Sequence, residues 1–213
     1  MFDVIWRSWR RARPLLWLAG LAGVAVALAA VGGAAGQSAT RLVPIGAGYE
    51  SDTLELFAAQ AAARDNDSVI TIRVLPITYH TNPTTISDAR RRDNLELAQY
   101  RADQIAEACA AVASATQTCE STVVDIQIRS DALDPDRFNL LSPDVDGYYI
   151  LGGDQTVAMR VVANTPTEAA LAAGYATGAA VGGNSAGAAV VSRYMIGGYL
   201  GDNFAWDGLH PVS

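Results

Sequence analysis

The stretch Val181–Ser192, V-G-G-N-S-A-G-A-A-V-V-S, decides the fold that we expect for this chain. It contains the pattern G-x-S-x-G at 183–187, between a predicted strand at 179–183 and a predicted helix at 186–195. A serine on such a sharp turn is strained and exposed, and it needs small neighbours two residues away on either side. The pattern therefore predicts a nucleophile elbow at Ser185. The alternative is an ordinary serine cap in a glycine-rich turn.

A second motif, I-L-G-G-D-Q at Ile150–Gln155, follows a predicted strand at 147–151. Ligands gather at the carboxyl edge of a parallel sheet, so this loop can face the turn at Ser185. Its Gly-Gly pair would let backbone amides approach an oxyanion. Asp154 and Gln155 would offer polar contacts to a substrate.

The remaining segments alternate between predicted strands and helices. We expect strands at 41–45, 69–77 and 123–128, and helices that begin near residue 51 and cover 88–113, 156–163 and 167–177. For the helix at 88–113 we expect the inner side to carry Leu95, Leu97, Ile105 and Ala108. This alternation predicts an α/β protein with a mostly parallel sheet covered on both faces.

Together the two motifs resemble one family, the cyanophycinase and aspartyl-dipeptidase (peptidase E-like) serine peptidases. G-G-D-Q stands about thirty residues before G-N-S-A-G-A-A-V-V-S, and the resemblance extends over roughly 42–198. It implies a three-layer α/β/α fold of the class I glutamine-amidotransferase type, in which serine replaces the usual elbow cysteine.

The resemblance also implies a set of site residues. Ser185 would be the nucleophile, and Gly153 or Asp154, together with Ala186, would supply the oxyanion amides. Gln155 would contact the substrate, which in this family is a small aspartyl peptide or an aspartate–arginine polymer. No metal or organic cofactor is implied.

The catalytic base is where the chain departs from the family. The family places its histidine well downstream of the serine, in a segment that is missing here, so we expect a fold that is incomplete at the C-terminus. The chain has two histidines. His210 has surroundings that do not match, and His80 precedes the serine. Two rival interpretations follow: an amidotransferase-like binding domain that lacks the base, and an α/β-hydrolase esterase, whose H-G-G-G oxyanion loop we do not find.

Composition excludes several other functions. All fifteen cationic side chains are arginine, which excludes lysine Schiff-base chemistry and a phosphate-binding P-loop. Two histidines are too few for a histidine-rich metal site. The formal net charge is −7, although the leader is basic, and an acidic body argues against nucleic-acid binding.

The first 39 residues predict a signal peptide or signal anchor, and residues 40–213 form the predicted catalytic domain. Met1–Arg13 is basic, an apolar run covers 15–31, and small residues follow it. The folded part would be secreted or extracytoplasmic, touching a membrane only through this segment, with a homodimer as an open alternative. In such a compartment we favour a disulfide between Cys109 and Cys119 over two buried thiols.

Overall fold

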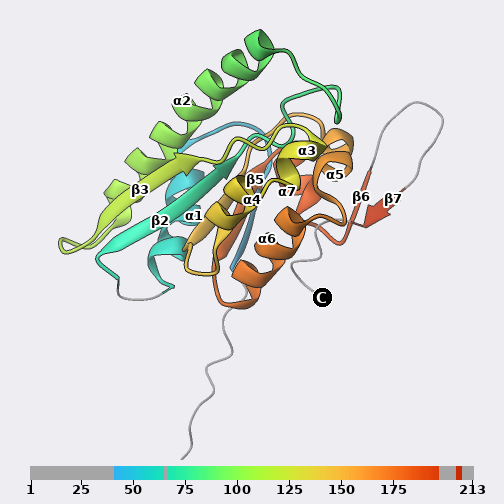
Figure 1. The fold of residues 1–213 in the computed structure, drawn as a ribbon. Coiled ribbons are helices and arrows are strands. Elements are labelled where there is room, and N and C mark those ends of the chain that lie inside the picture. Colours follow the sequence, from blue (N-terminus) through green and yellow to red (C-terminus); the bar gives the residue numbers. More distant parts are fainter. Residues whose placement is uncertain (1–40, 65–66, 197–204, 208–213) are drawn as a thin grey trace, which may run out of the picture. The chain divides into compact units, whose positions relative to one another are not determined.

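The computed structural model describes residues 41–64, 67–196 and 205–207 (Figure 1). The predicted leader and His210 lie outside these residues. Within the described ranges, no helix is both long enough and apolar enough to cross a bilayer.

A five-stranded sheet forms the centre of the domain, in the order β1-β5-β4-β2-β3. These strands are β1 (Leu42–Ile45), β2 (Val69–Leu75), β3 (Thr118–Val123), β4 (Gly147–Ile150) and β5 (Ala180–Asn184). Every neighbouring pair is parallel, so all five carboxyl ends lie at one edge. A separate antiparallel pair consists of β6 (Tyr194–Ile196) and β7 (Ala205–Asp207).

Helices cover both faces of the sheet (Figure 1). One face carries α1 (Ser51–Ala62) and α2 (Asp88–Val112). The other carries α5 (Gln155–Val162), α6 (Pro166–Ala176) and α7 (Ala186–Val190), with the short α3 (Arg129–Ala132), α4 (Pro135–Phe138) and η1 (Asn139–Leu141) beside them. Successive β4 residues alternate between the two cores: Tyr148 joins one and Tyr149 the other, as a strand's period of two requires. The predicted three-layer α/β fold is confirmed.

Three predicted details were wrong. The third strand covers Thr118–Val123, not 123–128. On α2, Leu97 is 47% exposed, while Ala98 and Ala102 are fully buried against the sheet side. The helix after Ser185 ends at Val190, and the chain then enters β6. The other predicted helices and strands agree with the observed boundaries to within about two residues, whereas α3, α4, η1, β6 and β7 were not predicted.

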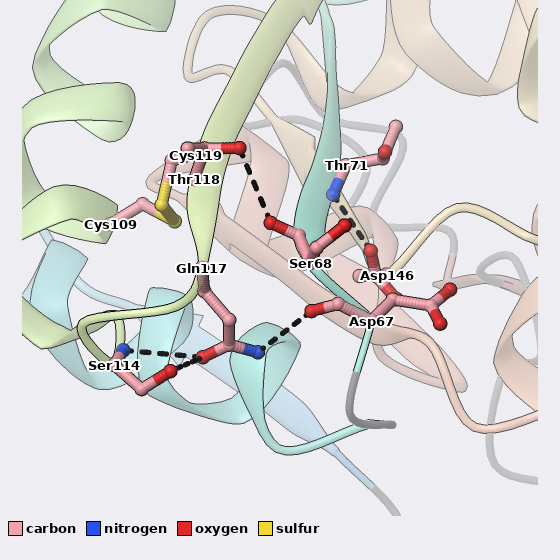
Figure 2. The surroundings of a disulfide bond; sticks show 9 residues. All are labelled: Asp67, Ser68, Thr71, Cys109, Ser114, Gln117, Thr118, Cys119 and Asp146. Carbon is pink, nitrogen blue, oxygen red and sulfur yellow. Dashed lines mark hydrogen bonds between the residues drawn. A yellow bond between two sulfur atoms is a disulfide. The ribbon is translucent and has the colours of Figure 1, made fainter.

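The two cysteines form a disulfide, as favoured from the sequence (Figure 2). Cys109 lies in the last turns of α2 and Cys119 is the second residue of β3. The turn between them is tied down further by Gln117, whose side-chain amide donates to the Asp67 carbonyl at 3.2 Å and accepts from the Ser114 amide at 3.2 Å. The bridge therefore fixes the edge strand to the helix that covers it.

Candidate active site

Ser185 occupies a strained turn between β5 and α7. Its backbone has φ 51° and ψ −118°, in the positive-φ region that side chains other than glycine rarely adopt. Its side chain is exposed, whereas both chain neighbours, Asn184 and Ala186, are buried. The turn is held from β1, because the Ser185 amide donates to the carbonyls of Ile45 at 3.1 Å and Gly46 at 2.6 Å. This is the geometry of a nucleophile elbow.

The small residue two positions after the serine is a steric requirement. A Cβ on Gly187 would lie 2.0 Å from the carbonyl oxygen of Ile150 and 2.9 Å from that of Leu151. Both atoms belong to the backbone of β4 or its end, so no rotamer change could make room. The first turn of α7 therefore lies directly against the end of β4.

The Gly-Gly loop after β4 faces the elbow, as the sequence predicts. A Cβ on Gly152 would lie 3.2 Å from the Cβ of Ser185. The Gly152 amide donates to the side-chain oxygen of Asn184 at 3.0 Å, and Asn184 is only 4% exposed. A buried amide side chain on the elbow thus fixes the neighbouring loop beside Ser185. Sequence reasoning gave Asn184 no role.

Thr78, in the loop after β2, holds the same loop from its other side. Its hydroxyl donates to the carbonyls of Leu151 at 2.8 Å and Gly152 at 2.9 Å. Its carbonyl accepts from the Asp154 amide at 2.9 Å, and it lies so close that a Cβ on Gly153 would be 2.3 Å away. Thr78 was also missed, although its place just after a predicted buried strand put it at the correct edge of the sheet.

These contacts show which of the candidate oxyanion amides is already hydrogen-bonded. The Asp154 amide is used by Thr78, and its carboxylate caps α5 by accepting from the amides of Thr156 at 2.8 Å and Val157 at 3.1 Å. Asp154 is therefore a structural residue here, which corrects its expected role as an oxyanion donor. No residue that the structure describes accepts a hydrogen bond from the amides of Gly153 or Ala186.

The remaining predicted residues have separate outcomes. Gln155 is the first residue of α5 and is partly exposed at the same edge of the sheet. His80 lies in the loop after β2, with its Nε2 at 2.8 Å from the Thr85 carbonyl. Within 41–64 and 67–195, where side chains are described, none hydrogen-bonds to the Ser185 hydroxyl. The described residues thus bring together an exposed serine hydroxyl and two amides, with no histidine or carboxylate in contact with the hydroxyl.

Three tyrosines and an arginine line the α1–α2 side of this edge. The Tyr49 hydroxyl lies 3.5 Å from the Gly152 amide nitrogen, and its ring lies 6.5 Å from that of Tyr149. The guanidinium of Arg101, on α2, lies 3.8 Å from the centre of the Tyr49 ring. Burial raises the pKa of Tyr79 and that of Tyr149 well above the ordinary tyrosine value, with Tyr49 adding to both shifts.

No model of a known family and no curated protein matches this sequence. Among solved structures, the chain is similar to the crystal structure of a peptidase from an acI-B1 Actinobacterium, with a TM-score of 0.59 and 19% sequence identity. The match covers 81% of this chain and 64% of that chain, so this chain spans less than two thirds of that peptidase's length. At this identity the likeness establishes the α/β fold alone.

Proposed function

We propose that this chain is a serine-type peptidase that hydrolyses aspartyl peptide bonds through an acyl-enzyme on Ser185. The observation that carries the proposal is the exposed Ser185 at φ 51°, on a strand-to-helix turn that faces the loop after β4. The name of the peptidase with a similar fold supports the reaction class. The aspartyl preference rests on the resemblance of the two motifs to cyanophycinases and aspartyl dipeptidases.

The reaction would follow the usual course of acyl transfer. The Ser185 hydroxyl oxygen attacks the scissile carbonyl carbon while a base takes its proton. The amides of Gly153 and Ala186 donate to the oxyanion of the tetrahedral intermediate. The base then returns the proton to the departing amine, and water hydrolyses the acyl ester. Gln155, at the start of α5, would contact the substrate.

The first experiment is covalent labelling of the full chain with a fluorophosphonate, mapped by mass spectrometry, with Ser185→Ala as the control. We expect one labelled peptide containing Ser185 and no label in the variant. Hydrolysis of aspartyl-leucine and β-aspartyl-arginine would then be compared with that of a short-chain ester. Turnover of the ester without turnover of either dipeptide would favour an esterase. Labelling elsewhere in the chain would refute Ser185 as the nucleophile.

The base is a separate question, with His80 and His210 as the candidates. We expect His210→Ala to slow labelling if the downstream histidine acts, in keeping with the family's order, and His80→Ala to slow it if the loop after β2 supplies the base. The pH dependence of the labelling rate should show an apparent pKa near that of histidine, and the responsible variant should lose it. Unchanged profiles in both variants would exclude histidine as the base.

One observation favours a second candidate function, a binding domain without catalysis: the Ser185 hydroxyl has no hydrogen-bond partner among the described residues. Without a base, a serine hydroxyl is a poor nucleophile at neutral pH. This candidate predicts binding of an aspartyl peptide by calorimetry, together with no labelling and no turnover.

We further propose that the domain is exported, either cut free near Gln37 or held by its leader. The disulfide between Cys109 and Cys119 supports this, because such bonds persist in oxidising compartments and are rare in the cytosol. N-terminal sequencing and cell fractionation of the native protein test it. Reduced thiols in a cytosolic, uncut chain would refute export.

A further inference from the structure

Arg101 is a half-buried cation with no anionic partner among the described residues. Its guanidinium lies over the Tyr49 ring, 3.8 Å from the ring centre, and donates to the Gln104 side-chain oxygen at 2.7 Å. No carboxylate of the described residues forms an ion pair with it. By contrast, Arg91, earlier on the same helix, contacts two aspartates. The charge of Arg101 is therefore available to a ligand.

A short series of contacts connects Arg101 to the nucleophile. Arg101 covers the face of Tyr49, and the hydroxyl of Tyr49 lies 3.5 Å from the Gly152 amide nitrogen. Gly152 is in turn so close to the elbow that its Cβ would lie 3.2 Å from that of Ser185. One aromatic side chain, Tyr49, and one loop residue, Gly152, thus separate the Arg101 guanidinium from Ser185.

The wall behind this pair contains an unsatisfied donor. Tyr149 is fully buried, and its hydroxyl makes no hydrogen bond. The ring of Tyr149 lies 6.5 Å from that of Tyr49, and Tyr49 in turn carries the guanidinium of Arg101 on its face. Buried hydroxyls without a partner are uncommon, and a bound acceptor is one way of satisfying them.

A cavity next to Tyr49 carries negative charge and would repel an anion. This cavity of about 280 Å³ between α1 and α2 is bordered by Tyr49 and Gln104, and it also carries Glu55 and Glu107. An acidic group near Tyr49 would therefore be directed away from this cavity and toward Arg101.

We propose that Arg101, stacked on Tyr49, binds a carboxylate of the substrate and so selects peptides that present a carboxylate at that position. This rests on the proposed function of the site. A guanidinium remains charged at any physiological pH, and its planar fork matches a carboxylate in two parallel hydrogen bonds. The shared chemistry is the carboxylate, which can come from an aspartyl side chain or from the free C-terminus of a dipeptide.

The test compares three matched ligands: aspartyl-leucine, asparaginyl-leucine and aspartyl-leucinamide. Values of kcat/KM are measured for the full chain and for Arg101→Gln, with Arg92→Gln as the control, because Arg92 is an exposed arginine on the same helix. Loss of a charge-assisted pair should lower the Asp/Asn ratio about 10- to 100-fold if the side chain is bound. If the C-terminus is bound, the acid/amide ratio should fall by the same factor instead.

A purely structural role for Arg101, as a support for Tyr49, would lower all three values together and leave both ratios unchanged; that result overturns the proposal. Arg101→Lys, which keeps the charge but loses the fork, should lower the affected ratio less than Arg101→Gln does. If Arg101→Gln does not fold, as judged by circular dichroism, the ratio in Arg101→Lys decides.

Catalysis and binding are kept separate by calorimetry on the Ser185→Ala chain. If the wild-type chain turns over none of the three ligands, the proposed function fails. Binding affinities still test the carboxylate site. Ser185→Ala should bind aspartyl-leucine more tightly than the analogue that lacks the bound carboxylate, and Ser185→Ala/Arg101→Gln should lose this preference. Equal binding of the three ligands, or no binding, refutes it.

Discussion

Replacing Gly187 with alanine should destabilise the turn at Ser185 and displace the loop that faces it. The added methyl carbon would lie 2.0 Å from the Ile150 carbonyl oxygen, far inside van der Waals contact. Because the obstructing atoms are backbone, α7 and the end of β4 must separate. Overpacking of this kind typically costs 1–3 kcal/mol, and the absence of any rotameric escape puts the expected loss at about 3 kcal/mol. The displaced end of β4 would also carry Gly152 away from Ser185.

Urea unfolding and the rate of fluorophosphonate labelling measure the two effects. A shift of the order of 1 Å in the oxyanion loop can lower a rate about 100-fold, which is the loss expected for Gly187→Ala. Gly46→Ala is the matched control, because a Cβ there meets nothing within 4 Å; its stability should change by no more than about 0.5 kcal/mol. Equal stability and equal labelling of the two variants would refute the close packing of α7 against β4.

Three further predictions concern the support of the site. Reduction of the Cys109–Cys119 bridge should lower the free energy of unfolding by roughly 2–3 kcal/mol, and the reductant should have no effect on the Cys109→Ser/Cys119→Ser chain; an identical drop in both would assign the effect elsewhere. Burial raises the pKa of Tyr148 from 10.0 to about 12, so the stability it contributes is intact below pH 10 and is lost as the pH rises toward 12. Urea titrations between pH 10 and 12 measure this. The free energy of unfolding should fall less steeply with pH in Tyr148→Phe than in wild type, by about 1.4 kcal/mol per pH unit, and parallel slopes would contradict this. Asn184→Ala removes the acceptor at 3.0 Å from the Gly152 amide and leaves it only the Tyr49 hydroxyl at 3.5 Å, so it should cost about 1–3 kcal/mol together with slower labelling of Ser185; wild-type labelling would show that the loop is held without it.

The fold could be predicted because its strongest signals are local. A β-branched run such as Val69–Leu75 and a G-x-S-x-G turn specify a strand and an elbow without reference to distant residues. The third strand was misplaced for a physical reason. β3 is an edge strand of alternating exposure, T-C-E-S-T-V, so it is polar, whereas the more apolar segment after it is buried without forming a strand.

That buried segment is stabilised by contacts between side chain and backbone that no local pattern reveals. The Asp131 carboxylate accepts from the amides of Gln127 at 3.0 Å and Ile128 at 3.1 Å. Similarly, α2 packs through alanines and turns Leu97 outward, because small side chains let the helix approach its neighbours closely. A prediction from hydrophobicity alone would bury Leu97 in place of the alanines.

The candidate site was predicted where it depends on one motif and missed where it depends on contacts between loops. Ser185 and the Gly-Gly loop were placed at one edge of the sheet from their sequence patterns, and the structure brings them together. Thr78, Asn184 and Tyr49 were missed because each acts on a residue far away in the chain. The amide of Asp154 was assigned wrongly for the same reason, since its partner is the Thr78 carbonyl.

The pairing of the first strand with the fifth has a consequence for how the molecule assembles. Ile45 lies opposite Asn184, and the carbonyls that hold the Ser185 amide belong to the start of the chain. Contacts between residues so distant in sequence form slowly, because the intervening chain must be ordered first. The strained turn at Ser185 should therefore be among the last features to form during folding. A chain emerging from the ribosome, or passing unfolded through a narrow channel, would have no preformed elbow until its first and fifth strands meet.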